Sequence, residues 1–338
     1  MSPGHRGLTR RNFLQYAAGL PVVAGLAACA PSPLITPQAD TSPMPAPTMD
    51  QPRRLAARAA ADLAELASGC AAIAEADGRL TDWLAALAEQ HRAHQTVLSQ
   101  ADPLGGVQSD HSPLEEIVAS PLPVPATQDD VMRVLAAQHN RLADILQPMV
   151  DDPASEPGMA LLWISQQLAA RITAAAMEPA DVAGLGPPPT AGGAVPAELS
   201  APGDAEQARQ VLLSHQRALV FGLQAMLGQA AHDDPVAAAL GDRLGQAMRE
   251  RDQTAAQISD TGTSPEPAAA EYELPGGSAD PSQRELTWGR LEYAVAAAWA
   301  RVAAMDAAGR EDASANALVQ ASRARDHGFA LPYWPGWV

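Results

Sequence analysis

Three histidines lie on the apolar faces of two predicted helices. In the predicted helix 79–101, His91 and His94 continue a stripe of leucines, because residues three and four apart share one side of a helix. In the predicted helix 128–149, His139 continues a similar stripe. Imidazole nitrogen is a common ligand of zinc, copper and iron. The pattern therefore makes His91, His94 and His139 candidate ligands of a transition metal.

The same histidines also fit a second interpretation, in which each is neutral, buried and hydrogen-bonded to a carbonyl or a carboxylate. No cysteine or acidic residue lies at a helical spacing that would complete a metal site. A ferritin-like di-iron site needs Glu-x-x-His on two helices. No glutamate in the sequence is followed three places later by histidine; Glu89, for example, is followed by Arg92. We therefore expect no cofactor, with a transition metal as the alternative.

A further candidate pair comes from the second half of the chain. His215 lies on the apolar stripe of the predicted helix 204–232, and Glu292 lies beside the stripe of the predicted helix 282–308. The two could form a buried polar pair, although an exposed position at the edge of the stripe is commoner for glutamate. The sequence contains no G-x-S-x-G elbow and no phosphate-binding glycine loop. We therefore name no catalytic residue and expect a protein without enzymatic activity.

Helical periodicity runs through most of the chain from residue 53 onward and favours an all-α fold. Within each half, the second and third helices are separated by a long connection, Asp102–Thr127 or Asp260–Pro281. A long connection that crosses the end of a bundle makes these two helices parallel, which is the ferritin-like topology. We therefore expect two tandem four-helix bundles with ferritin-like connectivity. The predicted helices are 53–76, 79–101, 128–149, 158–177, 204–232, 235–259, 282–308 and 311–327.

Composition divides the chain into five parts. A faint internal echo, in which His139 and His215 each precede an Asp-Asp-Pro sequence, supports a tandem duplication of the helical part. The predicted parts are a signal peptide (1–28), a disordered tether rich in Pro, Ser and Thr (29–52), a first four-helix bundle (53–178), a Pro/Gly linker (179–203), and a second bundle with an aromatic tail (204–338).

The N-terminus carries paired arginines and an apolar run that ends at a cysteine. Arg10 and Arg11 precede Phe13 and Leu14, and the run closes on the sequence Leu-Ala-Ala before Cys29. The run is shorter than the roughly 20 residues of a membrane span. These residues resemble a twin-arginine export signal ending in a lipobox. The resemblance implies a protein anchored to the membrane by an N-terminal lipid on Cys29, at the extracytoplasmic face of the cell membrane.

Charge and cysteine content exclude several classes of function. All 22 basic residues are arginine, against 39 acidic residues, and the net charge is −17. Such an acidic chain is unsuited to bind nucleic acid or to dock on anionic lipid. Cysteine occurs at two positions. If Cys29 carries lipid, Cys70 has no partner for an intrachain disulfide.

The last ten residues are rich in aromatic side chains. Pro332 and Pro335 prevent the last helix from continuing, so we expect this tail to fold back over the end of a bundle. The alternative is an exposed aromatic hook that contacts a partner or the membrane interface. The aromatic residues concerned are Phe329, Tyr333, Trp334 and Trp337.

Several short motifs of the second half carry a family resemblance. They are Val211–His215, Tyr272–Pro275, Leu291 with Glu292, and the closing segment Ala330–Gly336. Residues 204–335 thereby resemble an actinobacterial ferritin-like domain of unknown function that is found in exported and lipid-anchored proteins. The resemblance implies a ferritin-like fold and a location in the cell envelope, and it implies no established activity.

We predict a lipid-anchored cell-envelope protein that acts as a non-enzymatic binding or interaction module, with an envelope protein as its partner. The alternative is a metal- or cofactor-binding ferritin-like protein, such as an oxidoreductase, that uses the inward-facing histidines. A third interpretation is a bundle that encloses a small apolar ligand. The alanine-rich stripes argue against a large cavity, because small side chains let helices approach closely.

Overall fold

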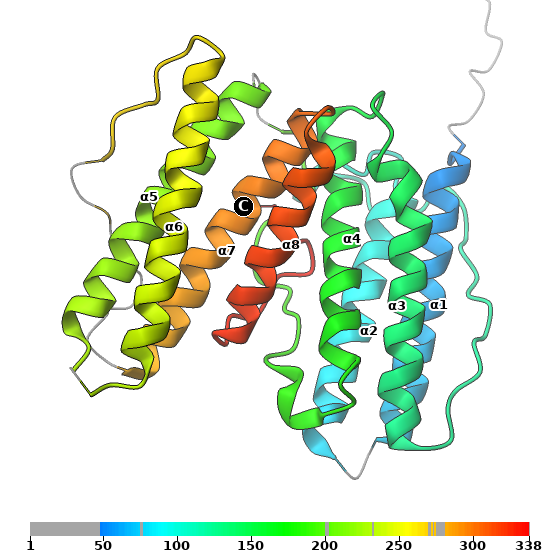
Figure 1. Ribbon diagram of the computed structural model, residues 1–338. Coiled ribbons are helices and arrows are strands. Elements are labelled where there is room, and N and C mark those ends of the chain that lie inside the picture. Colours follow the sequence, from blue (N-terminus) through cyan, green and yellow to red (C-terminus); the bar gives the residue numbers. More distant parts are fainter. Residues whose placement is uncertain are drawn as a thin grey trace, which may run out of the picture. The chain divides into compact units, whose positions relative to one another are not determined.

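The computed structural model describes residues 48–74, 77–199, 203–231, 233–269, 272, 274 and 281–337. Within these residues the chain forms eight α-helices and no strand, which confirms the predicted all-α fold (Figure 1). The predicted export signal, with Arg10, Arg11, Phe13, Leu14 and Cys29, lies outside the described residues. The helices are α1 (Gln51–Ile73), α2 (Gly78–Ser99), α3 (Gln128–Val150), α4 (Pro157–Met177), α5 (Ala205–Gln229), α6 (Val236–Asp260), α7 (Pro281–Met305) and α8 (Arg310–Asp326).

Side-chain caps mark the starts of α1, α2, α3 and α5. Asp50, Asp77, Thr127 and Asp204 each accept a hydrogen bond from a backbone N–H in the first turn of the helix that follows. Each cap satisfies one of the N–H groups that have no partner inside the helix. All the helix starts agree with the predicted ones to within two residues, whereas α1, α5 and α7 each end three residues before the predicted end.

In the first group of helices, α1 packs against α2 and α3, and α3 packs against α4. The segment between α2 and α3 runs along α1. Its Glu115 contacts Arg54 near the start of α1, and its Val124 lies against Gly69 near the end of α1. Because α2 also starts beside the end of α1, α2 and α3 begin at the same end of the group and run in the same direction (Figure 1).

The second group repeats this pattern of neighbours. Here α5 packs against α6 and α7, and α7 packs against α8. The contact between α5 and α7 is close because Gly222 has no side chain: a Cβ atom at this position would lie 2.3 Å from Cδ1 of Leu291. The repeated pairing of helices adds to the faint sequence echo in support of a tandem duplication.

The two groups belong to one compact unit, residues 47–338. Helix α4 of the first group contacts both α7 and α8 of the second, and the hydrophobic core continues across this contact. The predicted linker and the C-terminal tail pair with each other, because the backbone N–H of Thr190 donates to Leu331 (3.0 Å) and that of Tyr333 donates to Thr190 (2.8 Å). Among the described residues, no helix is long and apolar enough to cross a membrane.

Candidate functional site

The structure brings the three candidate histidines together inside the first group. Nε2 of His91 on α2 lies 2.9 Å from Nε2 of His139 on α3. The ring centroids of His91 and His94 are 5.8 Å apart, and those of His91 and His139 are 5.0 Å apart. Each of the three residues is at most 2% exposed. The three side chains therefore lie in the core, as their spacing predicted.

Hydrogen bonds fix which nitrogen of each ring carries the proton. Nδ1 of His139 donates to the carbonyl of Leu135 (2.7 Å), so its Nε2 accepts from Nε2–H of His91. Nε2 of His94 donates to the carbonyl of Tyr333 (2.7 Å). Nδ1 of His91 and Nδ1 of His94 then carry lone pairs, and neither atom has a hydrogen-bond partner among the described residues.

All three rings are held neutral by their surroundings. Burial lowers the pKa of His94 to about 4, and burial likewise lowers the pKa of His139 to about 4. Burial and the neighbouring imidazoles lower the pKa of His91 well below its ordinary value. Charged imidazolium would be costly in this core because it would lose its hydration.

The three histidines belong to a hydrogen-bonded polar cluster in the core. The Nε2 atoms of all three histidines are already engaged in hydrogen bonds. In the part of the chain that the structure describes, no group of three or more His, Cys, Asp or Glu side chains could hold a metal ion. Metal binding by His91, His94 and His139 stays a prediction that no observation on this chain tests.

The predicted pair of His215 and Glu292 is wrong. Glu292 is fully buried, and its two carboxylate oxygens accept from Arg243 of α6 at 2.7 and 3.0 Å. No hydrogen bond joins His215 to Glu292 among the described residues; His215 is partly buried on α5, and burial lowers its pKa. The sequence could have predicted that Arg243 is buried, because it lies on the apolar stripe between Leu240 and Ala247.

Arg243 and Glu292 are the centre of a larger polar network between α6, α7 and α8. Trp288 donates its indole N–H to Glu292 (2.9 Å). Nη2 of Arg243 also donates to Gln320 and to Glu250, both at 3.1 Å. In each group a buried polar pair thus joins the second helix to the third: His91 with His139 in the first group, and Arg243 with Glu292 in the second. In each pair the two side chains are hydrogen-bonded to each other.

The C-terminal tail is buried, which contradicts the alternative of an exposed aromatic hook. Trp334 and Trp337 are 3% and 4% exposed. The Trp334 ring lies 4.3 Å from the ring of His94, and the backbone N–H of Gly336 donates to the Tyr293 hydroxyl (3.3 Å). The tail therefore contacts α2 of the first group and α7 of the second, where burial of two indole rings stabilises it.

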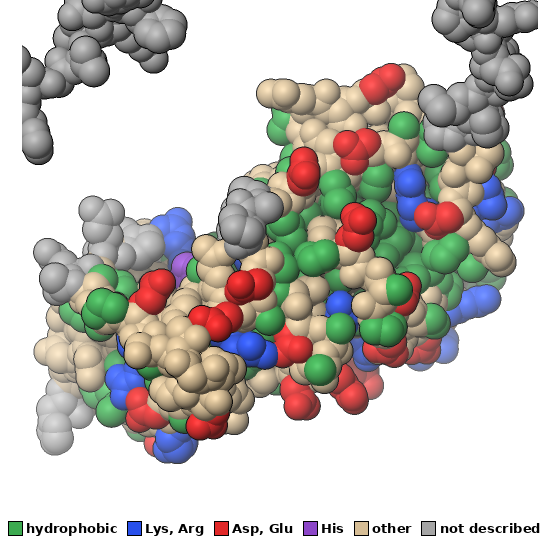
Figure 2. Space-filling view, turned by 90° about the horizontal axis from the view of Figure 1, so that it is seen from above, with side chains coloured by type: hydrophobic (Ala, Val, Ile, Leu, Met, Phe, Trp, Pro, Cys, Tyr) green, Lys and Arg blue, Asp and Glu red, His purple; other side chains and the backbone are tan. Residues whose placement is uncertain are grey.

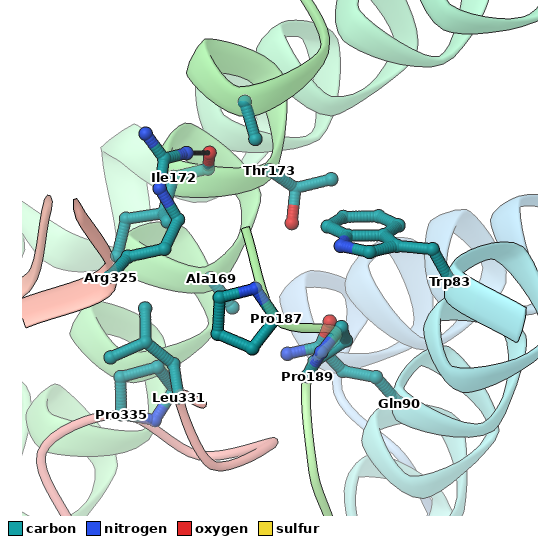
Figure 3. A pocket seen from close by; sticks show the side chains of 11 residues that line it. Trp83, Gln90, Ala169, Ile172, Thr173, Pro187, Pro189, Arg325, Leu331 and Pro335 are labelled. Carbon is teal, nitrogen blue, oxygen red and sulfur yellow. Dashed lines mark hydrogen bonds between the residues drawn. The ribbon is translucent and has the colours of Figure 1, made fainter. Parts of the chain in front are cut away.

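A cavity lies beneath this tail (Figure 3). It is lined by Trp83 of α2, Thr173 of α4, linker prolines such as Pro187, and Arg325 at the end of α8, whose Nη1 donates to Ile172. Its volume is about 30 Å³. Pockets for small organic ligands measure roughly 300–1,000 Å³. This cavity is therefore too small to be such a binding site.

A groove lies between α6 and α8, with a volume of about 580 Å³. Its floor includes Trp299 of α7, and one end carries Arg209 of α5 paired with Asp306. Acidic and amide side chains of α6 and α8 form the walls. The volume is in the range of ligand pockets, and the groove is open to solvent.

A second hollow, of about 550 Å³, lies where α1 and α4 begin and α3 ends. Its walls include Leu55, Ile145 and Met159, together with acidic residues such as Glu156. Figure 2 views this end of the first group, where hydrophobic side chains gather with isolated acidic ones among them. This second hollow is more apolar than the groove between α6 and α8.

Comparison with known proteins identifies a family for the second half of the chain. Residues 208–336 match the family model described as "Domain of unknown function (DUF4439)". No curated protein and no solved structure matches the chain. The matched residues include α6, α7 and α8, and with them both the Arg243–Glu292 pair and the groove. The second half of this chain therefore contains a DUF4439 domain, a domain of unknown function.

Proposed function

We propose that this protein is a lipid-anchored, extracytoplasmic binding module without enzymatic activity, and that the groove between α6 and α8 is its binding surface. The observation that carries the proposal is the contrast between core and groove. The buried pairs His91–His139 and Arg243–Glu292 are each hydrogen-bonded internally, whereas the groove is open to solvent, has a volume of about 580 Å³ and is lined by both polar and apolar side chains. We further propose that each helical group has ferritin-like connectivity.

The residues that line the groove support binding over catalysis. They include no histidine and no cysteine, the side chains that most often act as general base or strong nucleophile. Two of the four lining carboxylates, Glu250 and Asp306, form ion pairs with arginines. An arrangement of this kind can hold a partner.

The proposed anchor fits a protein that reaches for a partner in the cell envelope. Twenty residues lie between Cys29 and Asp50, the cap of α1. At roughly 3.3 Å per residue, a tether of that length reaches at most about 70 Å. The acidic body would not be held on an anionic membrane by charge, so the lipid supplies the attachment and the body stays free to bind a protein.

A photo-crosslinking side chain at Asn316, an exposed residue of the groove on α8, tests the proposal in intact cells. We expect a discrete adduct with an envelope protein, and we expect the adduct to weaken when Cys29→Ser releases the protein from the membrane. The matched control carries the same side chain at Arg133, an exposed position on α3. Equal labelling from Asn316 and Arg133 would contradict a binding function for the groove.

One observation favours the alternative of a metal- or cofactor-binding protein. Nδ1 of His91 and Nδ1 of His94 are buried lone pairs without hydrogen-bond partners among the described residues. A buried acceptor without a partner is costly, and a bound cation would remove that cost. Metal analysis of the native protein separates this candidate from the binding module.

A further inference from the structure

We propose that the groove between α6 and α8 binds a basic segment of a polypeptide partner, through arginine or lysine side chains of that segment. This inference rests on the proposed function, because it names the chemistry of the partner for the same surface. Four observations carry it: the carboxylates of the groove that have no ion pair, the helix ends that meet there, Trp299, and the amide side chains of the walls.

The groove carries more negative charge than its own arginines neutralise. Four carboxylates line it, against one lining arginine, Arg209. Glu250 and Asp306 are paired with arginines. Asp260 and Asp312 are exposed, and neither carboxylate has an ion-pair or hydrogen-bond partner among the described residues. Two carboxylates are thus left to attract a cation.

The ends of two helices strengthen the negative potential. Helix α6 ends at Asp260 and α7 ends at Met305, both at the groove, and the C-terminal end of a helix carries a partial negative charge of about half an electron. Asp260 therefore lies where a carboxylate disfavours its own helix, and the last turn of α6 has no basic residue to offset it. Asp312 lies in the first turn of α8, where it stabilises the helix.

The other groups of the groove select the kind of cation. The partly buried Trp299 ring on the floor can receive a guanidinium or ammonium group, because cations are attracted to the indole face. The amide side chains of the walls, such as Gln253 and Asn316, can hydrogen-bond a peptide backbone. A polypeptide supplies both parts, a basic side chain for the carboxylates and backbone amide groups for these side chains. A simple polyamine supplies the cation alone.

The test measures binding of a fluorescent peptide of alternating arginine and glycine to the intact, purified protein. We expect saturable binding that weakens as salt is raised. The double variant Asp260→Asn, Asp312→Asn should bind about tenfold more weakly, because two exposed charge pairs are lost. The matched control is Asp144→Asn, Asp242→Asn, two exposed mid-helix carboxylates away from the groove, and it should keep the affinity within about twofold.

Equal losses in the two double variants would overturn the inference, because binding would then reflect only the acidic surface as a whole. Equally tight binding of spermidine, measured by competition, would also overturn it and would assign a small polyamine. Either result leaves the proposed function standing if Asn316 still gives its specific adduct in cells. Loss of that adduct, with peptide binding intact, would instead remove the proposed function.

Discussion

Replacing Glu292 with alanine is expected to lower the free energy of unfolding by about 3–5 kcal/mol, the largest effect we predict for a single substitution. Glu292 is fully buried and holds the guanidinium of Arg243, which is 5% exposed. Without the carboxylate, only the partly exposed Glu250 would compensate that charge in the core, and the indole N–H of Trp288 would lose its acceptor. Chemical denaturation followed by circular dichroism measures the change.

Two controls separate this effect from a general loss of side-chain contacts. Glu89→Ala removes an exposed ion pair with Arg92 and should change the free energy of unfolding by less than about 0.5 kcal/mol. The double variant Arg243→Met, Glu292→Leu removes both charges and should recover most of the loss, because apolar residues of similar volume can replace a buried pair. Equal effects of Glu292→Ala and Glu89→Ala would contradict a buried charge pair in the core.

Acid is expected to destabilise the metal-free protein through its buried histidines. The pKa of His94 and that of His139 are about 4 in the folded protein, against an ordinary value of 6.5. Below pH 6.5 these histidines bind protons in the unfolded chain but stay neutral in the folded chain. Their contribution to the free energy of unfolding is therefore fully present above pH 6.5 and is lost as the pH falls toward 4. From pH 7 to pH 5 the loss should be roughly 2 kcal/mol for each of these histidines.

The slope of stability against pH tests this prediction, because the acidic residues contribute a background of their own. The variant His94→Gln, His139→Leu should lose stability less steeply than the native protein between pH 7 and pH 5, whatever its stability at pH 7. His111→Gln, at an exposed histidine, is the control. The same slope in the native protein and the double variant would show that protonation of these rings does not limit stability in acid.

The helices could be predicted from the sequence because their signal is local. Apolar residues recur every three or four positions, and Asp50, Asp77, Thr127 and Asp204 cap the helices that follow them. The inward position of His91, His94 and His139 followed from the same periodicity. Periodicity predicts which face of a helix is buried. All three side chains lie on the buried faces of α2 and α3, which the structure brings together in the first group.

The partners of these side chains could not be predicted, because they come from distant parts of the chain. His94 donates to the carbonyl of Tyr333, which is 239 residues away. Glu292 pairs with Arg243 instead of His215, because the long side chain of Arg243 reaches from α6 to α7. The tail is buried because α4 packs against α7 and α8, and no local pattern reports how two groups of helices pack. The groove was missed for the same reason.

The choice between a binding module and a cofactor protein depends on what the native protein carries in its core. The most direct measurement is elemental analysis and an absorbance scan of the protein, purified from its membrane without chelators and without a histidine tag. Our account predicts no near-stoichiometric metal and no visible absorption band, because the inward histidines bind one another and Tyr333. Near-stoichiometric metal or a visible band that is lost in the variant His91→Ala, His139→Ala would contradict it.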